Sequence, residues 1–138
     1  RNRDYRSANT GFMEGKMKQA VVGIYEMGWV QVELVLREDT GGEFYRIPEK
    51  GKVSRIKIGA DYDDFKEVIN CLFHEAWELC LDNWHVRYTP DRVLGNSHEQ
   101  YLFVFDHHKF TDICYCTAEF ITACWSDLQK EWLNWRVK

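Results

Sequence analysis

The spacing of apolar residues changes near residue 60, from the alternation of β-strands to the three-and-four spacing of helices. In the segment 52–59, Ser54, Ile56 and Ile58 fall on one side and charged residues on the other. Strand character is found in four segments: 19–26, 29–36, 44–47 and 52–59. Four successive strands followed by helices predict an α+β fold with a small antiparallel meander sheet.

Two helices are expected to pack on this sheet. The first spans 63–84, with caps and N-terminal negative charge from the acidic residues of 61–64. A short strand at 101–105 precedes the second, which we expect to begin at Phe110 with Thr111 as its N-cap. The apolar stripe of the second helix comprises Ile113, Thr117, Phe120, Ile121, Cys124, Leu128 and Trp132.

The domain organisation follows from periodicity and length. Residues 1–16 show no periodicity and are expected to form a flexible tail. The remaining 17–138 suit a single domain, because domains cluster near 100–150 residues. The 15% share of aromatic residues argues against disorder over most of the chain.

Charge and cysteine content narrow the class of function. A net charge of −4 disfavours a nucleic-acid partner, because such proteins gather positive charge. No apolar run is long enough to span a bilayer, and no signal peptide is recognisable. The five cysteines are an odd number in helical segments, which indicates reduced thiols in the cytoplasm. We expect a cytoplasmic protein with a protein or peptide as its substrate or partner.

The sequence His74-Glu75-Ala76-Trp77-Glu78 is the pattern with the clearest chemistry. On a helix, His74 and Glu78 lie one above the other, so both could bind one metal ion. The related H-E-x-x-H pattern binds zinc through two histidines and uses its glutamate as general base. The sequence therefore predicts a Zn²⁺ site with His74 and Glu78 as ligands and Glu75 as the catalytic base.

A third ligand must come from another segment. His107 and His108 are the main candidates, because they sit between a strand and a helix start. His98 in the preceding loop is a weaker candidate, and His85 follows the motif helix too closely. Two histidines and one carboxylate with an open fourth position are the geometry of a catalytic zinc site.

The same residues also fit a helix face exposed to solvent. With Leu72 at the centre of the core stripe, His74 and Glu78 fall on roughly the opposite side of the helix. An α+β interaction domain with a polar helix face would show this pattern without any metal. Cys71, Trp77 and Leu81 flank the His74–Glu78 stripe, so that face is not uniformly charged, which favours a site.

The stretch 56–78, which reads IKIGADYDDFKEVINCLFHEAWE, resembles the core of small zincin-like metallopeptidases. In that family an edge strand leads to a helix with two apolar residues before its H-E motif. The stretch 101–110, YLFVFDHHKF, is similar to a segment of small phage-encoded proteins with H-E-x-x-E helices. Phe103, His107 and Phe110 fit the spacing of that segment.

The resemblance implies a zincin-like α+β fold and a peptidase-like, metal-dependent hydrolase with His107 as the third ligand. It also implies that the strand at 53–58 receives a substrate as an added strand. Glu78 stands where peptidases of this class have histidine. A second hypothesis is therefore a non-catalytic phage or mobile-element binding protein on a degenerate zincin-like fold.

Overall fold

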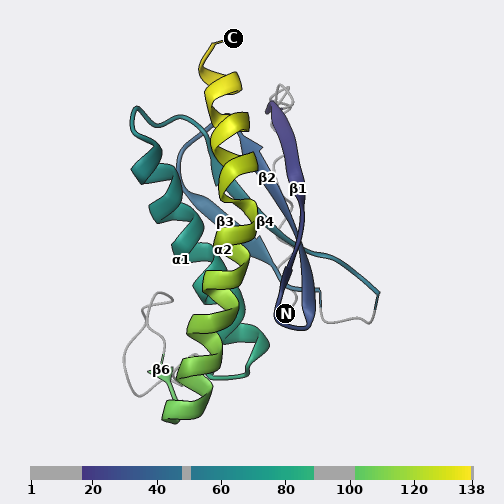
Figure 1. Ribbon diagram of the computed structural model, residues 1–138, viewed down its shortest axis with the longest axis vertical. Coiled ribbons are helices and arrows are strands. Elements are labelled where there is room, and N and C mark those ends of the chain that lie inside the picture. Colours follow the sequence, from purple (N-terminus) through teal and green to yellow (C-terminus); the bar gives the residue numbers. More distant parts are fainter. Residues whose placement is uncertain (1–16, 48–50, 89–101, 138) are drawn as a thin grey trace, which may run out of the picture.

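The computed structural model describes residues 17–47, 51–88 and 102–137. Residues 1–16, expected as a tail, and His98, a candidate ligand, lie outside the described residues. Figure 1 shows a sheet with both long helices on one side of it.

The described chain contains a four-stranded sheet in the order β1-β2-β4-β3. Strand β1 pairs antiparallel with β2, β2 pairs parallel with β4, and β4 pairs antiparallel with β3. The bounds are β1 Gln19–Met27, β2 Val30–Arg37, β3 Gly42–Tyr45 and β4 Ser54–Gly59. All four strands fall where the sequence predicts strands, with bounds within two residues of the predicted ones.

The pairing of the strands differs from the expected antiparallel meander. The chain reverses after β2 into β3, and β4 then inserts between them instead of adding at the edge. Alternation of apolar residues specifies a strand but not its neighbour, so the meander prediction is wrong. The expectation that 53–58 receives a substrate strand is also wrong, because both edges of β4 are paired.

The helices are α1, Phe65–Asn83, and α2, His107–Arg136. Asp64 caps α1 by accepting a hydrogen bond from the Lys66 backbone N at 2.9 Å. Between the helices, β5 Arg87–Tyr88 and β6 Leu102–Phe103 form a short antiparallel ladder. The predicted bounds of α1 are confirmed within two residues at each end.

Helix α2 begins earlier than the sequence predicts. Asp106, not Thr111, is its N-cap, and the Asp106 carboxylate accepts a hydrogen bond from Lys109 N at 2.9 Å. Thr111 lies within the helix and donates its hydroxyl to the His107 carbonyl at 2.9 Å. His107 and His108 are therefore the first two residues of α2.

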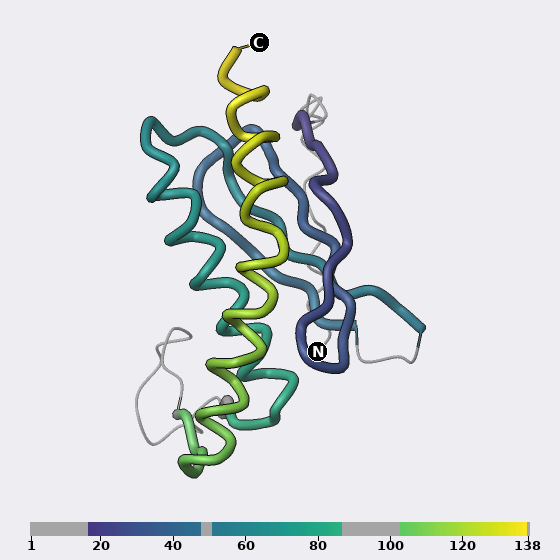
Figure 2. The backbone as a smooth tube through the Cα atoms, viewed as in Figure 1, coloured from purple at the N-terminus to yellow at the C-terminus, as the bar shows by residue number. Residues whose placement is uncertain are grey.

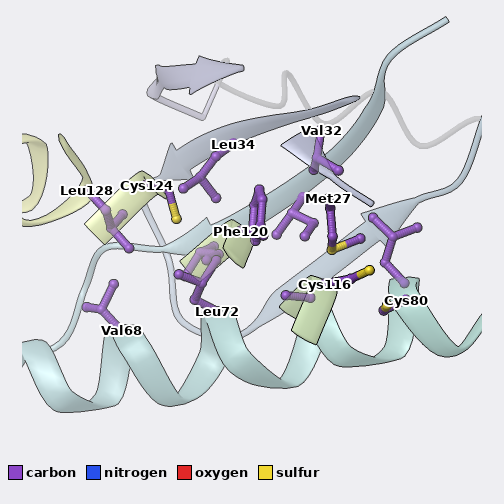
Figure 3. Packing of buried hydrophobic residues seen from close by; sticks show 14 of the residues in the cluster. Met27, Val32, Leu34, Val68, Leu72, Cys80, Cys116, Phe120, Cys124 and Leu128 are labelled. Carbon is purple, nitrogen blue, oxygen red and sulfur yellow. The ribbon is translucent and has the colours of Figure 1, made fainter. Parts of the chain in front are cut away.

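Both helices cover the same face of the sheet (Figures 1 and 2). Helix α1 packs over β3 and β4, and α2 packs over β1 and against α1. The core lies in this layer, and Figure 3 shows Phe120 among residues of both helices and the sheet. Fully buried side chains include Val32, Leu34, Leu36, Ile56, Ile58, Val68, Leu72, Leu79, Ile113, Phe120 and Leu128.

Polar contacts also join α2 to the sheet side of the domain, and two of them involve aromatic side chains. The Trp132 indole N–H donates to the Ala60 carbonyl at 3.2 Å, and the Tyr25 hydroxyl donates to the Asp127 carboxylate at 2.7 Å. Neither described helix has the length and apolar character needed to cross a membrane. The architecture is α+β, with one mixed sheet and one helical layer.

Candidate functional site

A groove of about 800 Å³ runs along one face of α1. Helix α1 supplies six of the described residues that line it, and the segment around β6 supplies two. They are Asn70, Phe73, His74, Trp77, Glu78, Leu81, Phe103 and Phe105. The α1 residues share this face because they are spaced three and four apart, which brings helical side chains together.

Helix α1 thus presents apolar residues in two directions. Val68, Leu72 and Leu79 are fully buried in the core. Phe73, which the periodicity places in the core stripe, is 46% exposed and lines the groove instead. The hydrophobic content of α1 therefore exceeds what its packing on the sheet requires.

His74 and Glu78 meet inside this groove, as the four-residue spacing predicts. His74 Nε2 lies 3.7 Å from Glu78 Oε2. The His74 side chain is 65% exposed and that of Glu78 is 23% exposed, so both remain accessible. An imidazole nitrogen and a carboxylate at this separation are too far apart for a hydrogen bond, but they can provide two ligands to one cation.

Glu75 faces a different neighbour. It is 7% exposed and does not line the groove. Its side chain packs beside Gly42 of β3 and Cys71, because a β-carbon at Gly42 would lie 2.6 Å from Glu75 Cγ and 2.9 Å from Cys71 Sγ. The expected general base is therefore packed on β3, and its role as a base stays a prediction.

Burial explains the electrostatics of this carboxyl group. Desolvation is the largest cause of the raised pKa of Glu75, and the nearby carboxylates of Glu78 and Glu43 add to it. His74 and Arg37 act in the opposite direction. Ionisation of the Glu75 carboxyl group is therefore less favourable in the folded chain than in water.

The candidate third ligands lie on the first turn of α2. His107 Nδ1 is 3.4 Å from the Thr111 hydroxyl, and His108 Nε2 is 3.5 Å from the Asp112 carboxylate. His107 borders a second hollow of about 290 Å³ with Phe105, Asp106 and Phe110, and Phe105 lines both this hollow and the groove. His107 itself is not among the described residues that line the groove of His74 and Glu78.

The structure brings together two of the four predicted site residues. Across 17–47, 51–88 and 102–137, no group of three His, Cys, Asp or Glu side chains is placed to hold a metal ion. His98 lies outside these ranges. The Zn²⁺ site of His74, Glu78 and His107, with Glu75 as base, stays a prediction.

Aromatic rings form much of the groove, and none of them was among the site residues predicted from the sequence. The Phe73 and Trp77 ring centroids are 5.7 Å apart, and Phe105 stacks on Phe110 at 5.4 Å. Trp77 Nε1 is buried without a hydrogen-bond partner, alone among the described buried side-chain nitrogen and oxygen atoms. The sequence signal was the four-residue spacing of Phe73 and Trp77 on the face of His74 and Glu78.

Comparisons of the chain with protein-family models, with curated proteins and with solved structures give no match. The resemblance to zincin-like proteins therefore stays a prediction.

Proposed function

We propose that this chain is a non-catalytic binding protein that takes a peptide segment of a partner protein into the α1 groove. The observation that carries the proposal is the exposure of large aromatic side chains inside one concavity. Phe73 and Phe103 are each 46% exposed and Phe105 is 37% exposed. All three line the same groove.

Burial of these exposed aromatic side chains against a partner would be favourable, because it removes apolar surface from water. Single exposed apolar residues are ordinary, but several that gather in one hollow indicate an interaction site. Ligand grooves have volumes of roughly 300–1,000 Å³ and combine apolar walls with a few polar groups. The groove of about 800 Å³, with His74 and Glu78 among its aromatic residues, fits that description.

Selection from a random twelve-residue peptide library tests the proposal. The wild-type chain should enrich a peptide family, and a Phe73→Ser/Phe103→Ser variant should bind the selected peptides at least about tenfold more weakly. The matched control is Tyr115→Ser, which removes a 70% exposed aromatic ring from α2, outside the groove. It should bind like wild type.

Two outcomes would overturn this function. One is that no peptide family is enriched. The other is that the selected peptides bind the groove variant and wild type equally, since they would then use another surface. Circular dichroism and thermal unfolding must show that the serine variant is folded, and both replaced rings are exposed enough for it to fold.

The second candidate function is a metal-dependent, peptidase-like hydrolase of zincin-like fold. It is favoured by the distance of 3.7 Å between His74 Nε2 and Glu78 Oε2, on adjacent turns and open to the groove. These two residues would hold the ion with His107, and zinc would supply an activated water. The strand-to-helix order from β4 to α1 is that of the zincin-like family, but β4 is an inner strand and the family has an edge strand at this place.

Zinc titration by calorimetry tests the second candidate. The predicted ligand set requires that zinc binding is lost in each of three variants, His74→Ala, Glu78→Ala and His107→Ala. The control variant His108→Ala should keep zinc binding. Loss of peptide cleavage in Glu75→Gln with zinc binding retained would support a catalytic base. Absence of zinc binding by the wild-type chain would overturn this candidate and leave the peptide-binding function intact.

A further inference from the structure

We infer that the partner segment presents an arginine side chain, whose guanidinium group pairs with Glu78 between the aromatic walls of the groove. This inference rests on the proposed peptide-binding function and names the chemistry of its ligand. No lysine or arginine is among the described residues that line the groove. Glu78 is the one carboxylate among them.

The Glu78 carboxylate has capacity for a further cation. Its one ion-pair partner in the described chain is His74, at 3.7 Å. Charge-assisted N–H···O bonds to carboxylates are about 2.7–2.9 Å long, so the contact with His74 leaves the carboxylate available. Ionised carboxylates accept two parallel hydrogen bonds from a guanidinium group, a geometry that an ammonium group does not reproduce.

The aromatic walls of the groove favour a guanidinium group over an ammonium group. Guanidinium is planar and weakly hydrated, and it stacks on aromatic faces. Trp77, the best ring type for such a contact, lines the groove together with Glu78. The chain uses this pairing elsewhere, because the Arg136 guanidinium lies 5.0 Å from the centroid of the Trp132 ring.

The apolar part of the groove accommodates the rest of the arginine side chain. Leu81 lies one helical turn from Trp77 and Glu78, and Phe103 supplies apolar surface from β6. A methylene stem packs on such surface while the charged head reaches the carboxylate. A lone aromatic ligand would gain the same apolar contact but would desolvate the Glu78 carboxylate without adding a cation beside it, which is unfavourable.

Nuclear magnetic resonance titration separates these cases. The probes are N-acetyl-arginine amide and N-acetyl-citrulline amide, which have nearly the same shape but differ in charge. The indole N–H signal of Trp77, assigned by its loss in Trp77→Phe, should shift saturably with the arginine probe. The citrulline probe should bind at least about tenfold more weakly, because it cannot form the ion pair.

Substitution of the acceptor tests the role of Glu78. Glu78→Gln keeps the shape of the side chain and should weaken arginine binding about tenfold while leaving the citrulline response unchanged. Glu119→Gln removes an exposed carboxylate from α2, away from the groove, and should change neither. Equal binding of the two probes, or equal binding by wild type and Glu78→Gln, would overturn the inference.

The library experiment distinguishes this failure from failure of the proposed function. Selected peptides that lack arginine yet lose binding in Phe73→Ser/Phe103→Ser would keep the peptide-binding function and reject the arginine inference. Selected peptides that contain arginine and lose affinity in Glu78→Gln would support both. Absence of any groove-dependent peptide would reject both.

Discussion

Glu75 of α1 packs against Gly42 of β3 so closely that a β-carbon on the glycine would lie 2.6 Å from Glu75 Cγ. This contact joins the first residue of an edge strand to the middle of a helix. It fixes how far α1 can slide along the sheet, and hence where the groove residues His74 and Glu78 stand. Glu75 thus packs α1 onto the sheet, whereas His74 and Glu78 of the same helix line the groove.

Gly42→Ala should lower the free energy of unfolding by about 1–3 kcal/mol, because the added methyl group overlaps Glu75 and Cys71. Urea denaturation measures the change. Gly42→Ala/Glu75→Ala removes one of the two clashing side chains, so the two substitutions should couple favourably by about 1 kcal/mol. A Gly42→Ala protein as stable as wild type would contradict the described packing of β3 on α1.

Phe120→Ala should destabilise the domain by about 3–5 kcal/mol, since the ring is fully buried and its loss leaves a cavity. Its centroid also lies 6.2 Å from that of Tyr25, so an edge-to-face contact is lost. Tyr115→Ala on the same helix is the control. Tyr115 is 70% exposed, and its removal should change stability by no more than about 0.5 kcal/mol.

The domain should lose stability as the pH rises above 9. Burial raises the pKa of Cys80 and of Cys124 from 9.0 to about 12. Between these values the unfolded chain releases thiol protons that the folded chain retains, so ionisation favours unfolding. Each such thiol contributes a slope of up to about 1.4 kcal/mol per pH unit.

Urea midpoints measured from pH 8 to pH 10.5 test this dependence. Cys124→Ala should make the decline with pH shallower, whatever its effect at pH 8. Cys114→Ala should leave the slope unchanged, because Cys114 is exposed in the folded chain. Parallel curves for wild type and Cys124→Ala would show that Cys124 is not shielded as described.

Thiol labelling at pH 8 should separate the five cysteines in order of exposure. Cys114 should react first with iodoacetamide, because its thiol is accessible. Cys71, half-buried with a pKa raised to about 11 by desolvation and Glu75, should react slowly. Cys80 and Cys124 should react only after denaturation, which mass spectrometry of peptides would reveal.

Periodicity was enough to predict the four strands of the main sheet and the presence of both helices, but not the short strand β5 or how the strands pair. The alternation of 52–59 indicates a strand and identifies Ile56 and Ile58 as core residues, both fully buried in the structure. It carries no information on neighbours, so the insertion of β4 between β2 and β3 could not be anticipated. The start of α2 was missed because Asp106 and Thr111 are both suitable caps, and only tertiary context decides between them.

The candidate site was predictable to the extent that it is local. The four-residue spacing of His74 and Glu78 brings them together on any helix, and the structure places them 3.7 Å apart. The contribution of Phe103 and Phe105 depends on how β6 meets α1, which is tertiary information. The burial of Glu75 depends on the approach of Gly42 of β3, a contact between residues 33 positions apart in the chain.

The insertion of β4 between β2 and β3 has a consequence for biosynthesis. As the chain leaves the ribosome, the β1–β2 hairpin can close once Arg37 has emerged. The segment Gly42–Tyr45 has no strand to pair with in this sheet until Ser54–Gly59 has been made. Assembly of the sheet therefore waits for β4, which pairs with β2 residues 22 positions earlier in the chain, and such non-local pairing is slow to form.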